Sequence, residues 1–277
     1  MKKMLLVSAI IYATGHAQEN YKQERVPFVK KIDERLELLK CIEEKEVLQV
    51  AQLLYKGANP NRPAPQLPPA LIVAIANRDF TMVKLLLEYN ADPNKRDWIW
   101  QRVPLICAVE EFQDDVVKLL LAHKAHPDLT NKKGHTALTL ACKCFNHSES
   151  SEKIIHALLD AGANPNIPNR NGRTPLHYMC TENLKLTRAL IRAGARVNHP
   201  DSRKYTALHK VVIACVQSYN KPAQGTQDKA AQQEFKAIIQ ILLDAGACPD
   251  LENKFKITAR ELCHGTDLEA LLKPKET

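Results

Sequence analysis

Cysteine and histidine are residue types that can bind a metal ion or take part in catalysis. The 277 residues include eight cysteines and ten histidines. Their tightest cluster is Cys142-x-Cys144-x-x-His147, which superficially suggests a zinc site. A closed structural zinc site needs four ligands, and this cluster supplies fewer. We therefore predict no metal site and no cofactor.

Catalysis by histidine would need a serine or cysteine nucleophile beside the ring and an acid that orients it. His177 and His209 occupy one recurring position of a repeated pattern, and the sequence places no such nucleophile and acid with them. We predict that the chain is not an enzyme.

Both histidines lie in helix starts, and residues 171–180 (NGRTPLHYMC) form the most complete one. Thr174 is of a type that caps helices by accepting bonds from first-turn N–H groups, and Pro175 suits the first helical position. Asn171-Gly172 is a tight-turn signal. The chain should therefore turn sharply and enter a helix.

This helix start recurs along the chain together with a second marker that closes each unit. The positions equivalent to Thr174 are Pro69, Val103, Thr136, Thr206 and Thr258, and Thr258-x-x-Glu261 also fits a capping box. The closing markers are residues 57–61, 90–94, 124–128, 162–166, 194–198 and 246–250. Two markers in phase at a period of about 33 residues predict a solenoid of helix pairs.

The repeated unit resembles that of the ankyrin-repeat family, with its Thr-Pro-Leu-His first helix, Val-x-x-Leu-Leu second helix and Gly-Ala-Asp-x-Asn ending. Residues 82–87 (MVKLLL) and 116–121 (VVKLLL) fit the second helix. The resemblance implies an all-α ankyrin-repeat solenoid, with loops called fingers that project between helix pairs. It also implies that the helix histidine ties adjacent fingers together through hydrogen bonds.

The expected organisation follows the markers. It comprises a signal peptide (1–17), a linker (18–31), repeat units at 32–61, 62–94, 95–128, 129–166, 167–198, 199–250 and 251–272, and a tail (273–277).

Residues 1–17 have the pattern of a signal peptide, with Lys2-Lys3, an apolar run and small residues at 15 and 17. They predict export to a periplasmic or secreted location. The alternative is an apolar capping helix on the first repeat in a cytoplasmic protein. The run is too short to span a bilayer, so we expect no membrane insertion of the mature chain.

The cysteines argue against export, because free thiols are unusual in an exported protein. Cys142 and Cys180 share one repeat position, about 10 Å apart in this family, which is beyond the reach of a disulfide. We predict free thiols that act as small buried apolar groups.

The net charge of +8 is dispersed, without arginine-rich runs or basic stripes interleaved with aromatic residues. We expect no nucleic-acid partner. A solvated surface explains the charge.

One finger, residues 95–102, carries a one-residue insertion and two tryptophans flanked by arginine. Exposed tryptophan beside arginine is typical of binding hot spots. The alternative is that one tryptophan packs on a neighbouring finger. The candidate protein-binding residues are Arg96, Trp98, Trp100 and Arg102 on this finger and Lys132, Lys133, Arg170, Arg173, Arg203 and Lys204 on later fingers.

Two longer insertions separate helices within repeats, at 143–152 and at 217–233, and the ends of the second could lengthen both flanking helices. The second insertion is either functional or disordered.

The family resemblance implies a non-enzymatic protein-binding module that uses its fingers and concave face. The basic fingertips favour a partner with an acidic surface, and we expect a monomer. The alternative is an accessory subunit that stabilises an enzyme in a bacterial envelope.

Overall fold

The computed structural model describes residues 36–62, 67–97, 101–219 and 226–272. The chain forms two compact units, a first unit over residues 1–132 and a second over 133–277. The sequence expectations for residues 1–17, for the linker and for both tryptophans lie outside the described residues.

The described residues are helical apart from loops and one isolated β-bridge between Glu252 and Thr258. This confirms the all-α fold. The first unit contains a helix over 36–43 and the helices α3 (Val47–Tyr55), α4 (Ala70–Ala76), α5 (Phe80–Glu88), α6 (Pro104–Glu110) and α7 (Asp114–Ala122). The second unit contains α8 (Ala137–Lys143), α9 (Glu149–Asp160), α10 (Pro175–Met179), α11 (Leu184–Arg192), α12 (Ala207–Tyr219), α13 (Thr226–Asp244), α14 (Ala259–Leu262) and α15 (Glu269–Leu272).

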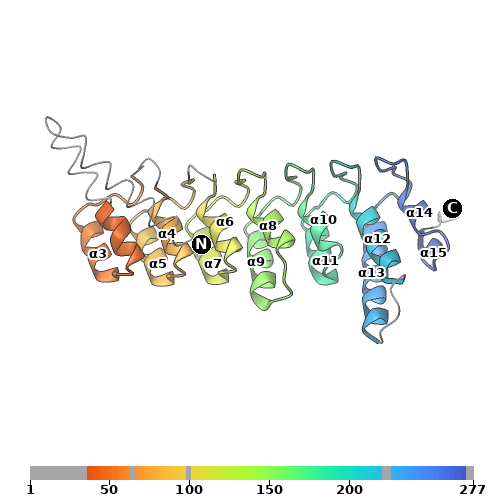
Figure 1. Cartoon of the computed structure of the whole chain (residues 1–277), viewed down its shortest axis with the longest axis horizontal. Coiled ribbons are helices and arrows are strands. Elements are labelled where there is room, and N and C mark those ends of the chain that lie inside the picture. The colour runs from red at the N-terminus through yellow and green to blue at the C-terminus, as the bar shows by residue number, and fades with distance from the viewer. Residues whose placement is uncertain (1–35, 63–66, 98–100, 220–225, 273–277) are drawn as a thin grey trace. The chain divides into compact units, whose positions relative to one another are not determined.

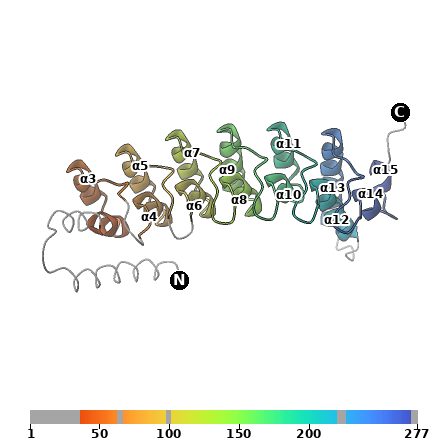
Figure 2. The same ribbon diagram turned by 90° about the horizontal axis from the view of Figure 1, so that it is seen from above.

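Each repeat pairs a short first helix, nearly all buried, with a second helix that buries one face. In α4 every residue from Ala70 to Ile75 is buried, whereas α5 buries its stripe of Met82, Val83, Leu86 and Leu87. In the second unit the first helices α8, α10 and α12 lie in one row and the second helices in another (Figure 2). The fingers before α8, α10 and α12 project on one side (Figure 1).

The predicted helix starts are present with their caps. Pro175 and Pro104 occupy first-turn positions. The Thr136 hydroxyl accepts from the Thr139 N–H at 3.1 Å. Thr258 and Glu261 form the reciprocal capping box that the sequence predicts, with bonds of 3.1 and 2.7 Å. At Thr174 the partner is instead the His177 ring, whose Nδ1 lies 2.9 Å from the hydroxyl.

The closing marker works as a bridge between successive repeats. The Asn166 amide donates to the Gly194 carbonyl at 2.9 Å and accepts from the Arg196 N–H at 2.7 Å. The same pair of bonds is made by Asn61 to residues 90 and 92, by Asn94 to residues 124 and 126, and by Asn198 to residues 246 and 248. An asparagine is needed because one side chain must both donate and accept.

The two insertions lengthen helices. The segment 143–152 adds a turn at the start of α9, where Ser148 accepts from the Ser151 N–H, so part of the expected inter-helix extension is helical. The segment 217–233 extends α12 to Tyr219 and begins α13 at Thr226, so its ends lengthen both flanking helices as predicted, and both helices extend beyond their neighbours in the second unit (Figure 1).

No disulfide joins any of the eight cysteines, all of which lie in the described part of the chain, as the repeat geometry predicts. Cys142 and Cys180 are fully buried in the core. In the same described part, no helix is both long and apolar enough to cross a bilayer.

We predict that Asn166→Asp lowers the free energy of unfolding by about 1–2 kcal/mol, because the carboxylate cannot donate to Gly194. Asn59→Asp is the matched control, since Asn59 only accepts from the Asn61 N–H and aspartate keeps that bond. Urea unfolding of both variants at pH 7 measures the difference. Equal midpoints would refute the bridging role.

Candidate functional site: the finger face and its pocket

A buried Asn or Asp organises each finger of the second unit. The Asn169 Oδ1 accepts from the backbone N–H of Asn171 and Arg173, and Asp201 does the same for residues 203 and 205. Asn253 repeats the pattern for residues 255 and 257. A backbone bond closes each hairpin, for example Asn169 N–H to the Arg173 carbonyl at 2.9 Å. The hairpins are therefore held from inside by a side chain.

Backbone bonds also join neighbouring fingers of the second unit. The Arg170 N–H donates to the Lys133 carbonyl, the Ser202 N–H to the Asn171 carbonyl and the Lys254 N–H to the Arg203 carbonyl, at 3.3, 2.9 and 3.0 Å. We call these three bonds the finger ladder. Gly172 permits the approach: it has φ +70°, and a Cβ there would lie 2.8 Å from the Ser202 nitrogen.

The histidines tie fingers to helices, as the family resemblance implies. The Thr174 N–H donates to His177 Nδ1 at 3.2 Å, so the ring proton lies on Nε2 and is donated to the Tyr205 carbonyl at 3.0 Å. His209 makes the same contacts to Thr206 and, at 3.3 Å, to the Ile257 carbonyl. Burial lowers the pKa of His177 to about 4 and also lowers that of His209. Both rings are neutral connectors at pH 7.

The inserted residue of the tryptophan finger lies inside its hairpin. The closing bond joins Asp97 to Arg102, five residues apart, whereas Asn169 and Asp201 close over four. The Arg102 side chain pairs with Asp97 at 3.0 Å and with Glu110 at 3.5 Å. Arg96 is exposed and donates to the carbonyls of Gln101 and Thr130. Trp98 and Trp100 lie outside the described residues, so their contact role stays a prediction.

The other predicted contact residues differ in exposure. Lys132 is exposed in the first unit. In the second unit Lys133, Arg170, Arg203 and Lys204 are exposed on the fingers that the ladder joins, and Lys204 has the left-handed φ of +60° at the turn. Arg173 is only partly exposed and turns down towards the first helices, where it lies 5.8 Å from the centre of the Tyr178 ring.

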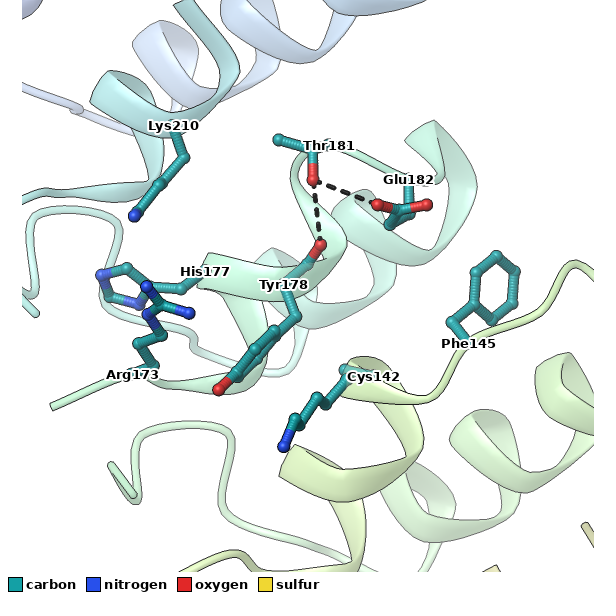
Figure 3. Close-up of a pocket in the computed structure, with 9 residues that line it drawn as sticks. Cys142, Phe145, Arg173, His177, Tyr178, Thr181, Glu182 and Lys210 are labelled. Carbon is teal, nitrogen blue, oxygen red and sulfur yellow. Dashed lines mark hydrogen bonds between the residues drawn. The ribbon is translucent and has the colours of Figure 1, made fainter. Parts of the chain in front are cut away.

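A pocket of about 300 Å³ lies below these fingers, and we call it the finger–helix pocket. Its lining comes from α8, α10, α12 and the adjoining loops. The lining residues are Cys142, Lys143, Phe145, Arg173, His177, Tyr178, Thr181, Glu182 and Lys210. Figure 3 shows Arg173, His177 and Lys210 on one side of Tyr178, with Phe145 and Glu182 towards the other.

The cationic side of the pocket is built on a buried carboxylate. Asp201 is 5% exposed, and its Oδ2 lies 3.6 Å from Arg173 Nε and 3.5 Å from Lys210 Nζ. Burial alone would raise the Asp201 pKa, but the N–H groups of residues 205 and 203 and the Lys210 charge hold it below its usual value. One carboxylate thus orients two cations, and Lys143 adds a third charge to the lining.

The cysteines in and near the pocket are protonated thiols. Burial raises the pKa of the Cys142 thiol, and raises that of Cys180 to about 12, so neither is a thiolate at pH 7. Within the described residues no group of three or more His, Cys, Asp or Glu side chains is placed to hold a metal ion. Cys142 is buried and Cys144 exposed, so the sequence cluster around them does not converge.

A family model of ankyrin repeats in three copies matches residues 71–168 and 146–220. Together these matches span residues 71–220, which is more than half of the chain. The chain belongs to the ankyrin-repeat family.

The chain is similar to a solved ankyrin repeat domain in fold and to short stretches of curated proteins in sequence. The ankyrin repeat domain of Bcl-3 superposes with a TM-score of 0.67 at 19% identity, over 86% of this chain and 97% of that one. The human 2-5A-dependent ribonuclease is 41% identical over 71 residues, which are 26% of this chain and 10% of that protein. A fowlpox virus protein described as putative ankyrin repeat protein FPV014 is 36% identical over 89 residues, 32% of this chain and 20% of its own length.

This ankyrin-repeat chain therefore spans about a tenth of the ribonuclease and a fifth of the viral protein. Most of the length of each relative lies outside the matched segment. The similarity establishes repeats that mediate protein–protein interaction. It does not extend the ribonuclease activity named for that relative to this chain.

Sequence reasoning missed the residues that build the ankyrin fingers from inside. Asn169, Asp201 and Asn253 look like ordinary polar loop residues, yet all are at most 6% exposed. Their recurrence five residues before each helix-capping threonine was the available signal. Lys210 and Tyr178 were missed because their place in the pocket depends on the stacking of neighbouring repeats.

We predict that Gly172→Ala destabilises the protein by about 1–3 kcal/mol more than Gly194→Ala. Both glycines have positive φ, so both alanines carry the backbone strain, but at Gly194 a Cβ meets nothing within 4 Å. The difference in unfolding free energy from urea titration isolates the close approach to Ser202. Equal losses would contradict a tightly packed finger ladder.

We also predict that stability falls as the pH drops from about 6.5 to 4. The folded-state pKa of His177, about 4, lies below the unfolded value near 6.5, so the unfolded chain takes the proton first. The stabilisation that depends on the neutral His177 ring is fully present above pH 6.5. By pH 4 this ring lowers the free energy of unfolding by up to about 3 kcal/mol.

Urea titrations at several pH values measure the slope. His177→Asn should be less stable at pH 7, and its stability should depend less steeply on pH. Part of the pH dependence should remain, because burial also lowers the pKa of His135 and His209. Gly194→Ala, which destabilises without removing a titrating group, should keep the wild-type slope. A slope unchanged by His177→Asn would refute the assignment.

Proposed function

We propose that the chain is a non-enzymatic ankyrin-repeat module that binds an acidic surface of another protein with its fingers and first helices. The observation that carries the proposal is the row of exposed cations on fingers joined by backbone bonds: Lys133, Arg170, Arg203 and Lys204. The finger–helix pocket below them supports it, since Lys143, Arg173 and Lys210 line a space large enough for a side chain of the partner.

The rigidity of this face favours binding. The buried carbonyl and carboxylate groups of residues such as Asn169 and Asp201 fix each hairpin, and the ladder fixes neighbouring hairpins to one another. A surface that is ordered before binding loses little conformational entropy when a partner docks. Complementary charge then accelerates association and selects an acidic partner.

Arg173 and Lys210 have a defined place in this scheme. Because both are oriented by the same buried carboxylate, their charged ends are fixed at the pocket wall rather than free in solvent. A carboxylate of the partner that enters between them and Lys143 would meet three cations. Glu182, on the opposite wall and 3.6 Å from the His147 ring, limits where that carboxylate can lie.

We further propose that the protein acts outside the cytoplasm, on the basis of the signal-like pattern of residues 1–17. N-terminal sequencing of the mature protein tests this, because a chain that retains Met1 is not processed. Fractionation then separates a partner in the host or medium from an enzyme partner in a bacterial envelope.

We predict that Arg170→Glu/Arg203→Glu weakens binding to a partner purified after capture by the wild-type protein, by tenfold or more at low salt. The reason is that both side chains are exposed on ladder-joined fingers, where charge reversal repels an acidic surface. Titration calorimetry at two salt concentrations measures the change.

Lys84→Glu/Lys118→Glu on the second helices α5 and α7 is the matched control, with equal charge reversal away from the fingers. An equal effect of both double variants would mean that the finger face has no special role. Trp98→Ala/Trp100→Ala assayed alongside decides whether the tryptophans contribute, since unchanged affinity removes them from the interface.

A further inference from the structure

The second helix α11 differs in charge from the other second helices. α5, α7 and α9 each pair a lysine with a carboxylate four residues away: Lys84 with Glu88, Lys118 with Asp114 and Lys153 with Glu149. α11 has the sequence LKLTRALIR, with three cations and no carboxylate. Among the described residues, Lys185, Arg188 and Arg192 form no ion pair.

Helix stability does not explain this charge. Arg192 lies in the last turn, where a cation is favourable, but Lys185 lies in the first turn, where it is not. The acid at this N-terminus comes from a neighbour instead, since Glu234 of α13 accepts from the Leu184 N–H at 3.1 Å. The three cations are also exposed, so they contribute little to the core.

The cations border a groove between α9 and α11, which we call the second-helix groove. It has a volume of about 620 Å³. Leu159, Leu184, Ala189 and Ala193 give it apolar lining, and all but Ala193 are at least partly buried. His156 and Asp160 of α9 complete it, so three cations face one carboxylate.

We propose that the second-helix groove docks an acidic amphipathic helix of a partner protein, a second surface distinct from the finger face. Residues 185, 188 and 192 follow an i, i+3, i+7 pattern and span about 10 Å along the helix axis. A partner helix with carboxylates at a similar spacing can face all three cations. Its apolar side chains then cover the leucines and alanines between α9 and α11.

The groove suits a peptide better than other anions. Its lining has no Phe, Tyr or Trp on which bases could stack. It is recessed between two helices with small alanines in it, whereas a membrane-binding surface presents large apolar side chains outward. Charge and apolar contact together therefore favour an acidic protein segment.

The test uses the full chain and a fluorescein-labelled synthetic 16-residue peptide with leucine on one helical face and glutamate elsewhere. We expect saturable binding by fluorescence anisotropy that weakens as salt is raised from 50 to 200 mM. The same peptide with lysine in place of every glutamate should not bind. Absence of saturable binding of the acidic peptide to the folded wild-type protein overturns the proposal.

Two variants locate the site. Arg188→Glu/Arg192→Glu removes the cationic border, and Ala189→Trp fills the groove without changing charge. Each should raise the Kd at least tenfold, with circular dichroism confirming the fold. Arg170→Glu/Arg203→Glu on the fingers should change it less than twofold.

Other outcomes are decisive as well. A larger effect of the finger variant than of the α11 variant would assign the peptide to the finger face and refute the groove. Binding of single-stranded DNA or phosphatidylserine vesicles that depends on Arg188 and Arg192, without binding of the acidic peptide, would refute the partner class. Loss of finger-face binding in Arg170→Glu/Arg203→Glu leaves the groove result unaffected, so the two proposals fail separately.

Discussion

The structure depends on satisfying backbone groups in segments that are neither helix nor sheet. A finger exposes several N–H and C=O groups to its neighbours, and a buried group without a partner destabilises the fold by more than an average hydrogen bond stabilises it. Asn169 and Asp201 solve this within a hairpin, the ladder solves it between hairpins, and Asn166 solves it at the repeat junction. Each repeat therefore completes its hydrogen bonds only with the help of the next.

This dependence links the fold to its binding surfaces. The His177 ring of the first helix α10 bonds the Tyr205 carbonyl of the following finger, and Asp201 of that finger pairs with Arg173 of the preceding repeat. Side chains on successive repeats are therefore held in fixed relation within the second unit. Lys210 and Arg173 come from different repeats yet meet at one carboxylate. A pocket assembled in this way exists only in the stacked protein, and its shape changes with any shift between repeats.

The sequence predicts those features that are encoded locally. Thr258-x-x-Glu261 and Pro175 specify their helix starts through bonds and dihedral angles within one turn, and the structure confirms both. The recurrence of Asp201 five residues before a capping threonine indicates a structural position, but its burial and its two cationic partners depend on the stacking of neighbouring repeats, which the sequence does not show. The α11 charge pattern was readable from LKLTRALIR, but its significance required the ion pairs on the other second helices. The groove beside it could be seen only after α9 and α11 were placed.

Charged side chains whose place is not explained by contacts within the fold are the most informative about binding surfaces. Arg102 is held by Asp97 and Glu110, and Arg260 by both oxygens of Asp250, so contacts within the fold account for the charge of both arginines. Arg173 and Lys210 are intermediate, since Asp201 orients them while one face of each reaches the pocket. The exposed fingertip residues Arg170, Arg203 and Lys204 and the three cations of α11 lie at the other end of this scale, since none of them forms an ion pair within the described residues. Removing such a cation from water is favourable only when an anion replaces the water, which is why we propose an acidic partner for both surfaces.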